Sequence, residues 1–359
     1  MKISMDSIKC SKAYENGYSM IKYMQLDFTG KCNSNCKGCC GWRNHTGTEM
    51  PYEKALEILN ATLGEMNIKE IFLCCQAEFT LYSHCLDVIN HIEDNYKNVI
   101  MRQDTNGIYI PDGFIDRMNS LKNNYYDLSV SFWGGSKDEY KEYHGANNFD
   151  KVKNNIKRYL EEIKNPRVTF RFSTVFWNEE QFESALNCIK DICEEYNKSV
   201  KILNTISPED VLEYTTDKNE IVVYRRCSYY EIPVEDDFND DTYGVIREKT
   251  KIDETGKKIK YKEQMITKDW NGLRKPLDTD NNCFFLNRSM LIRIDGGVAG
   301  CLGTNDYHEN DLGNIFDQPV TAEWFKKIYT SEKRKKQQLL NATTGAFACC
   351  HKCISRICY

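Results

Sequence analysis

Over the first two hundred residues, short apolar segments rich in β-branched and aromatic residues alternate with amphipathic segments of helical period. The strand candidates are Lys22–Phe28, Glu70–Cys75, Val99–Asp104, Asp127–Phe132, Val168–Phe176 and Val200–Ile206. The spacing predicts helices over Tyr52–Met66, Ser83–Tyr96, Gly113–Leu121, Phe149–Glu162 and Glu179–Tyr196. This alternation is typical of βα units around a parallel sheet. Six strands favour a partial (β/α)6 TIM-like barrel over a closed eight-unit barrel or a doubly wound sheet.

The alternation ends near residue 207, which divides the chain into three predicted parts. Residues 1–206 form the partial barrel, and the charge-dense residues 207–280 are predicted to be a solvated connector with one hairpin, or a substrate lid. Residues 281–359 contain a strand, a glycine turn and a second strand over Leu291–Cys301, and then a helix from Thr321. They are expected to form a small β-hairpin/helix domain.

Composition and charge exclude several classes of protein. The chain has 359 residues, a net charge of -5 and no basic tract, which argues against a nucleic-acid partner. No stretch approaches the roughly 20 apolar residues of a membrane span, and the first residues carry no apolar signal region. A cytoplasmic location is therefore expected. The 17 cysteines indicate metal ligands and reactive thiols rather than a disulfide framework.

Three of these cysteines, Cys32, Cys36 and Cys39, lie in a polar loop directly after the first predicted strand. In parallel barrels the chemistry gathers at this end of the strands. Soft thiolates suit a 4Fe-4S cluster or zinc, but structural zinc sites have four protein ligands and usually pair their cysteines two residues apart. Three thiolates hold three irons of a four-iron cluster and leave the fourth open.

This C-x3-C-x2-C loop after an apolar strand resembles that of the radical S-adenosylmethionine (SAM) superfamily. The resemblance implies that the open iron chelates the amino and carboxylate groups of SAM. It also implies that a reduced cluster cleaves SAM to a 5'-deoxyadenosyl radical, which takes hydrogen from an unactivated C–H bond. The implied cofactors are one 4Fe-4S cluster with three cysteine ligands and SAM, and the implied partner is a flavodoxin- or ferredoxin-type electron donor.

The same resemblance suggests residues for SAM binding at the other strand ends. Gln76, Ala77 and Glu78 align with the Gly-Gly-Glu-Pro element that binds the SAM amino group, although only Glu78 matches. Asn106 belongs to a Thr-Asn-Gly turn common in these enzymes, and Ser131 and Arg171 are candidates for the ribose or carboxylate. Trp42 is a candidate for stacking on the adenine, because Gly38 stands where the family usually has an aromatic residue.

The C-terminal cysteines resemble those of the SPASM or twitch extension, which holds auxiliary iron-sulfur clusters. Six cysteines are too few for two clusters, so the resemblance implies one auxiliary 4Fe-4S cluster with the ligands Cys283, Cys301, Cys350 and Cys353. Cys349 is an alternative to Cys350, and Cys358 is a spare or an alternative ligand. Zinc is the alternative metal, since four thiolates suit it as well.

The reaction on the substrate stays open at this stage. An auxiliary cluster that accepts an electron favours oxidation or crosslinking, whereas epimerisation needs a hydrogen donor such as Cys75 or Cys227. A peptide natural product is the favoured substrate, and a sugar or aminocyclitol alcohol is the alternative. A non-catalytic iron-sulfur or zinc protein and an electron-transfer protein remain as rivals. His144 has no partner visible in the sequence and receives no catalytic role.

Overall fold

A central parallel sheet organises the computed structural model of this chain. The structure describes residues 21–36, 39, 45–73, 76–176, 179–203, 219–232, 245–252, 258–267, 289–300 and 311–343. The strands are β1 (Tyr23–Leu26), β2 (Glu70–Leu73), β3 (Ile100–Thr105), β4 (Tyr125–Ser131), β5 (Val168–Phe176), β6 (Ser199–Leu203), β7 (Glu220–Ile232), β8 (Val245–Ile252), β9 (Lys258–Thr267), β10 (Ser289–Ile292), β11 (Gly297–Ala299) and β12 (Gly313–Asn314).

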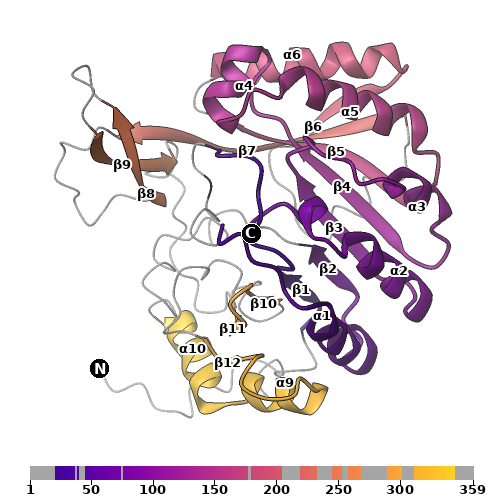
Figure 1. The fold of residues 1–359 in the computed structure, drawn as a ribbon, viewed down its shortest axis with the longest axis vertical. Helices are drawn as coiled ribbons and strands as arrows, with labels where there is room; N and C mark the ends of the chain where they lie inside the picture. The colour runs from indigo at the N-terminus through magenta and orange to yellow at the C-terminus, as the bar shows by residue number, and fades with distance from the viewer. Residues whose placement is uncertain are drawn as a thin grey trace.

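The helices alternate with the first six strands, as the sequence predicts. They are α1 (Tyr52–Leu59), α2 (Cys85–Asn95), α3 (Phe114–Ser120), α4 (Lys137–His144), α5 (Phe149–Glu162) and α6 (Glu179–Glu195), followed near the C-terminus by α9 (Ala322–Tyr329) and α10 (Glu332–Thr343). Helix α1 continues into the π-helical segment η3 (Asn60–Glu65), and the 3-10 turn η4 (Phe79–Leu81) follows β2. Helices α1 to α6 lie along one side of the sheet in Figure 1.

Strands β1 to β5 are neighbours in chain order, and each pairs with the next in parallel. Tyr126, Leu128 and Val130 of β4 belong to the same buried apolar cluster as the helix residues. Because side chains alternate along a strand, Asp127, Ser129 and Ser131 point to the opposite face, away from the helices. The structure therefore confirms the α/β class and a partial barrel with a parallel sheet, and its interior face carries polar residues.

Strand β7 differs from the expectation for residues 207–280. Its first half lies between β5 and β6 and pairs in parallel with both, while its far end pairs antiparallel with β9 of the expected hairpin. Ile221, Val222 and Val223 are buried there. This apolar run is only three residues long and lies in charged sequence, so the pattern does not separate it from a solvated connector.

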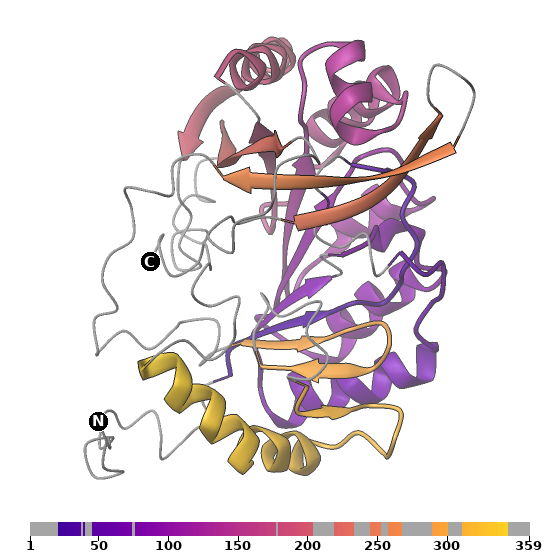
Figure 2. The same cartoon turned by 90° about the vertical axis from the view of Figure 1, so that its left-hand side faces the viewer.

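The hairpin of β10 and β11 extends the same sheet at its other edge. Strand β10 pairs in parallel with β1, and β11 and β12 follow in antiparallel order. Figure 2 shows these three strands beside β1, with α9 and α10 next to them. Thr321 caps α9 by accepting a hydrogen bond from the Trp324 amide, and Trp324 and Phe325 pack into the common core. The expected domain boundaries stay a prediction.

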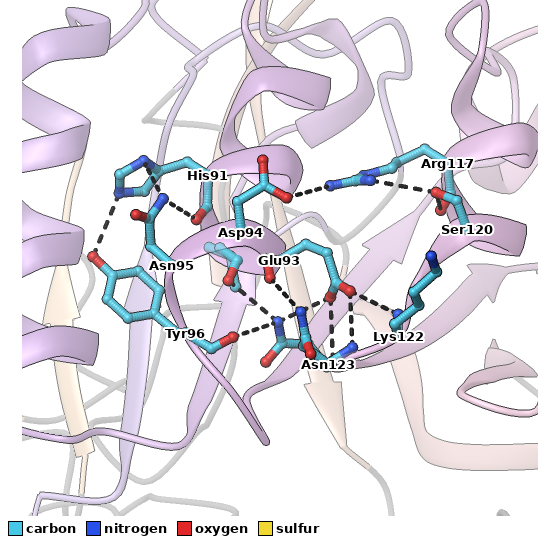
Figure 3. Close-up of polar contacts among 11 residues, drawn as sticks. His91, Glu93, Asp94, Asn95, Tyr96, Arg117, Ser120, Lys122 and Asn123 are labelled. Carbon is cyan, nitrogen blue, oxygen red and sulfur yellow. Dashed lines mark hydrogen bonds and ion pairs between the residues drawn. The ribbon is translucent and has the colours of Figure 1, made fainter.

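A buried carboxylate fixes the entry into β4. Glu93 of α2 is 4% exposed, and its side chain accepts hydrogen bonds from the backbone amides of Lys122, Asn123 and Asn124 at 2.6, 2.8 and 3.2 Å. Figure 3 shows this turn and the more exposed ion pair of Asp94 with Arg117 beside it. In the described ranges, no helix is long and apolar enough to cross a membrane.

Candidate active site

The cysteine loop follows β1 at the carboxyl end of the strands, where the sequence places it. Its first residues pair with the segment before α1: Gly30 N donates to Thr48 O at 2.8 Å, and Met50 N donates to Phe28 O at 2.9 Å. The amide of Glu78 donates to Lys31 O at 2.9 Å, which joins this loop to the one after β2. Two neighbouring segments therefore hold the start of the cysteine loop in place.

Each of the three cysteines lies near one side-chain nitrogen. Asn106 Nδ2 is 3.9 Å from Cys32 Sγ, His144 Nδ1 is 3.5 Å from Cys36 Sγ, and His45 Nε2 is 3.9 Å from Cys39 Sγ. All three cysteines are free thiols of intermediate exposure. Burial raises the pKa of Cys32 to about 11.

The donor set fits an iron-sulfur cluster in kind, because three soft thiols lie on one short loop beside nitrogen donors that suit cluster sulfur. As they stand, no group of three or more Cys, His, Asp or Glu side chains within the described ranges is arranged to hold a metal ion. Gathering of the three thiols around one cluster therefore remains a prediction.

Glu78 connects the loop after β2 to the loop after β3. It is 2% exposed, and its carboxylate accepts hydrogen bonds from the hydroxyls of Thr80 and Thr105 at 2.8 and 2.9 Å and from the Asn106 amide at 2.8 Å. Burial raises the pKa of this carboxyl. These contacts direct the Glu78 side chain at the protein's own donors, and its predicted contact with SAM stays a prediction.

The other two residues of the predicted SAM amino-group element lie beside it. The Gln76 side chain is buried, and the backbone carbonyl oxygen of Gln76 accepts a hydrogen bond from His45 Nε2 at 2.8 Å. Ala77 packs against the apolar core. His45 therefore contacts both Cys39 and the carbonyl that would face a bound amino group. No local sequence pattern indicates His45, because it lies 31 residues from Gln76 in the chain.

Asn106 is fixed as a link between the cysteine loop and β3. Its Nδ2 donates to Asn33 Oδ1 at 2.6 Å, and its Oδ1 accepts from the Ile108 amide at 2.9 Å. Of the predicted Thr-Asn-Gly turn, Gly107 alone takes a positive φ, at 71°. The turn is thus present, and its asparagine lies within reach of Cys32.

Arg171 and Ser131 lie on the interior face of the sheet. Arg171 Nε contacts Asp127 Oδ1 at 2.9 Å, and its Nη2 is 3.8 Å from Asp104. Arg102 extends this network from Asp127 to Glu70. Ser131 is the last residue of β4 and faces Ser173 of β5 in register. Arg171 is therefore part of a five-residue ionic network, and its proposed contact with a SAM carboxylate stays a prediction.

His144 is the functional candidate that the sequence reading left without a partner. It is the last residue of α4, is fully buried, and stacks between Trp133 and Tyr140 at centroid distances of 4.8 and 4.2 Å. Burial lowers its pKa to about 3. Its contact with Cys36 spans 108 residues, so no local pattern indicates it.

Several predicted residues fall outside what the structure describes. They are Trp42, Cys75, Cys283, Cys301, Cys349, Cys350, Cys353 and Cys358. Cys227 lies in β7, but its side chain is outside the described part. The proposed adenine stack, hydrogen donors and auxiliary ligands therefore stay predictions.

Two family models match this chain. The radical SAM superfamily matches residues 26–189, and SPASM, an iron-sulfur cluster-binding domain, matches residues 283–354. The first range holds all three loop cysteines, and the second holds Cys283, Cys301, Cys349, Cys350 and Cys353. No curated protein matches the chain in sequence.

Solved structures with the same fold include two peptide-bound proteins. Streptococcus suis SuiB bound to precursor peptide SuiA has a TM-score of 0.54 and 14% identity, and the match covers 88% of this chain and 67% of that one. Native anSMEcpe with bound AdoMet and Cp18Cys peptide has a TM-score of 0.53 and 14% identity, covering 94% and 87%. At this identity the likeness establishes the fold. The two family matches identify this chain as a radical SAM superfamily enzyme with a SPASM iron-sulfur domain, whose cofactors are iron-sulfur clusters and SAM.

Proposed function

We propose that this enzyme binds SAM at a 4Fe-4S cluster held by Cys32, Cys36 and Cys39, and modifies a peptide natural product by hydrogen abstraction from an unactivated C–H bond. The observation that carries the proposal is the loop of three thiols at the carboxyl end of β1, each thiol beside one nitrogen donor. When bound, the reduced cluster supplies the electron that cleaves SAM to methionine and the 5'-deoxyadenosyl radical.

The chain's own residues would orient SAM and keep water out. The three thiolates of the loop would leave one iron open, and the backbone at Gln76 and Ala77 would face the amino group. Glu78 would hold these two loops together through its bonds to Thr105 and Asn106. Ser131, at the end of β4, would offer its hydroxyl to the ribose or carboxylate.

The ionic network of the interior face lies inside the sheet, below the strand ends that would bind SAM. Glu70, Arg102 and Asp127 are all less than 9% exposed and come from three neighbouring strands. Their charges are paired inside the sheet, which leaves the strand ends as the open side for SAM and substrate.

A peptide substrate is supported by the two neighbours of the same fold, which are bound to a precursor peptide and to the Cp18Cys peptide. The SPASM domain would hold the auxiliary cluster through Cys283, Cys301, Cys350 and Cys353. With an electron acceptor there, oxidation or crosslinking of the peptide is the favoured outcome. Epimerisation would instead use Cys75 or Cys227 as the hydrogen donor.

The first experiment measures SAM cleavage. The protein is reconstituted with iron and sulfide without oxygen, reduced with dithionite and incubated with SAM, and 5'-deoxyadenosine is quantified by mass spectrometry. We expect multiple turnovers for the wild type, and at least a hundredfold less product when Cys32, Cys36 and Cys39 are each replaced by alanine. Cys188→Ala, a change of a buried cysteine in α6, is the matched control and should keep full activity. Cluster-loaded wild type without 5'-deoxyadenosine would refute the proposal.

The substrate class is tested in the same assay. Synthetic peptides encoded by short reading frames beside the gene are compared with a panel of sugars and aminocyclitols. We expect a peptide to raise 5'-deoxyadenosine formation. If it is oxidised or crosslinked, it should lose the mass of two hydrogens. If it is epimerised, it should keep its mass in H2O and take up deuterium in D2O. Stimulation by an alcohol alone would overturn the peptide assignment and leave the SAM chemistry intact.

A further inference from the structure

The histidine contact of Cys36 is shorter than the side-chain nitrogen contacts of the other two loop cysteines. The contact from His144 Nδ1 to Cys36 Sγ is 3.5 Å, whereas the nitrogen contacts of Cys32 and Cys39 are both 3.9 Å. Because a hydrogen bond weakens as the distance between donor and acceptor grows, the contact of Cys36 is the strongest of the three hydrogen bonds to sulfur.

The histidine ring is held in one orientation. Trp133 and Tyr140 stack on its two faces, with interplanar angles of 30° and 19°. A rotation of the ring would break both stacks, so His144 keeps Nδ1 directed at the cysteine loop.

The main chain fixes the same region a second time. The Asn35 amide donates to the His144 carbonyl oxygen at 3.0 Å. Gly145 ends α4 in the left-handed region with φ of 63°, and a Cβ there would lie 2.3 Å from Asn35 O. Only glycine permits this close approach, which brings the end of α4 against the residue before Cys36.

The hydrogen-bond pattern assigns the tautomer. The Trp133 amide donates to His144 Nε2 at 3.2 Å, so Nε2 carries no hydrogen and acts as an acceptor. A neutral imidazole has its one N–H on the other nitrogen, which is Nδ1. The ring therefore presents an N–H donor to Cys36 Sγ.

We propose that His144 is a positioning residue that donates an Nδ1–H hydrogen bond to the Cys36 thiolate and raises the reduction potential of the cluster. This inference rests on the proposed ligation of the cluster by Cys36. Reduction adds negative charge to the iron and sulfur atoms, and a donor at the sulfur stabilises that charge. The effect on the potential requires no proton transfer, since the same N–H is present in both redox states.

Three variants separate this role from a structural one. His144→Phe keeps a ring between Trp133 and Tyr140 but has no donor, and His144→Asn places an amide N–H near the position of Nδ1. His84→Phe is the matched control, because His84 is partly exposed and stacks on Tyr52, far along the chain from Cys36. Each protein is reconstituted and titrated without SAM, with detection by electron paramagnetic resonance. The relevant signal is the one that Cys36→Ala lacks.

We expect His144→Phe to lower the equilibrium constant for reduction about tenfold, which is about 59 mV for a one-electron couple. His144→Asn should recover a large part of this shift, and His84→Phe should match the wild type. An unchanged potential in His144→Phe would overturn the inference, and so would an equal fall in His144→Phe and His144→Asn.

A measurement on the unaltered ring covers the case in which His144→Phe fails to load its cluster. Protein labelled with 15N-histidine is reduced and examined by pulsed electron paramagnetic resonance. We expect a histidine nitrogen coupled to the cluster, and the coupling should persist in His45→Phe. Absence of this coupling in loaded protein would overturn the inference. A signal that survives in Cys36→Ala would instead refute the proposed ligand set.

Discussion

The carboxylate of Glu78 accepts hydrogen bonds from the Thr80 and Thr105 hydroxyls and from the Asn106 amide. A buried carboxylate that accepts several hydrogen bonds holds the donor segments in fixed positions, because loss of any partner leaves a polar group unsatisfied. At this scale the site depends as much on such positioning residues as on the thiols that would hold a cluster.

Glu70 offers a test of the ionic network on the interior face. Three carboxylates, Glu70, Asp104 and Asp127, share the two cations Arg102 and Arg171, and burial raises the pKa of Glu70 to about 7. The ordinary pKa of a glutamate, which applies to the unfolded chain, is 4.5. Between pH 4.5 and 7 the folded state binds more protons than the unfolded state, so stability falls as the pH rises through this window.

The matching experiment compares Glu70→Gln with the wild type by urea denaturation at pH 5 and pH 8. Glutamine cannot ionise, so its contribution does not change with pH. We expect the wild type to lose up to about 3 kcal/mol relative to the variant between these two pH values. An equal difference in unfolding free energy at both pH values would show that Glu70 is ionised throughout.

At the scale of elements, Glu93 shows how α2 sets the start of β4. Three backbone amides, those of Lys122, Asn123 and Asn124, donate to one buried carboxylate (Figure 3). Glu93→Ala removes the acceptor and leaves these amides without it, which should cost about 3 kcal/mol of unfolding free energy. Asp94→Ala is the control: Asp94 is exposed and its ion pair with Arg117 is 3.8 Å, so it should cost less than about 0.5 kcal/mol. Equal losses in thermal denaturation would contradict this role for Glu93.

The elements that the sequence predicts are those with a local pattern. The six strand candidates and five helix candidates of residues 22–206 are all present, because the periodicity of 2 or 3.6 is written into neighbouring residues. Strand β7 was missed, since its buried part is three apolar residues in charged sequence. Helix α4 was also missed; its capping box of Ser136 and Glu139 is the signal that would have found it.

The contacts within the candidate site were less accessible to sequence reasoning. The loop cysteines and Asn106 come from recognisable turns, and the structure brings Asn106 Nδ2 within 3.9 Å of Cys32 Sγ. His144 and His45 reach the cysteines from α4 and from the segment before α1, and only tertiary packing brings them there. A histidine has no partner until the fold supplies one.

At the scale of the whole molecule, β10 ties the SPASM part to the barrel. It pairs with β1 over Tyr23 to Leu26, and the cysteine loop begins six residues after that strand. Strand β1, which leads to Cys32, therefore pairs with β2 of the barrel on one side and with β10 of the SPASM part on the other, as Figure 2 shows for β1 and β10. The strands β1, β10 and β11 therefore belong to one sheet.

The central claim is that a cluster on Cys32, Cys36 and Cys39 keeps one iron open for SAM. The most direct measurement is the electron paramagnetic resonance spectrum of the reduced, reconstituted protein before and after addition of SAM. The account predicts that SAM changes one signal, and that this signal is missing when the three cysteines are replaced by alanine. A spectrum that SAM leaves unchanged in fully loaded protein, or the presence of zinc in place of iron on these thiols, would contradict it.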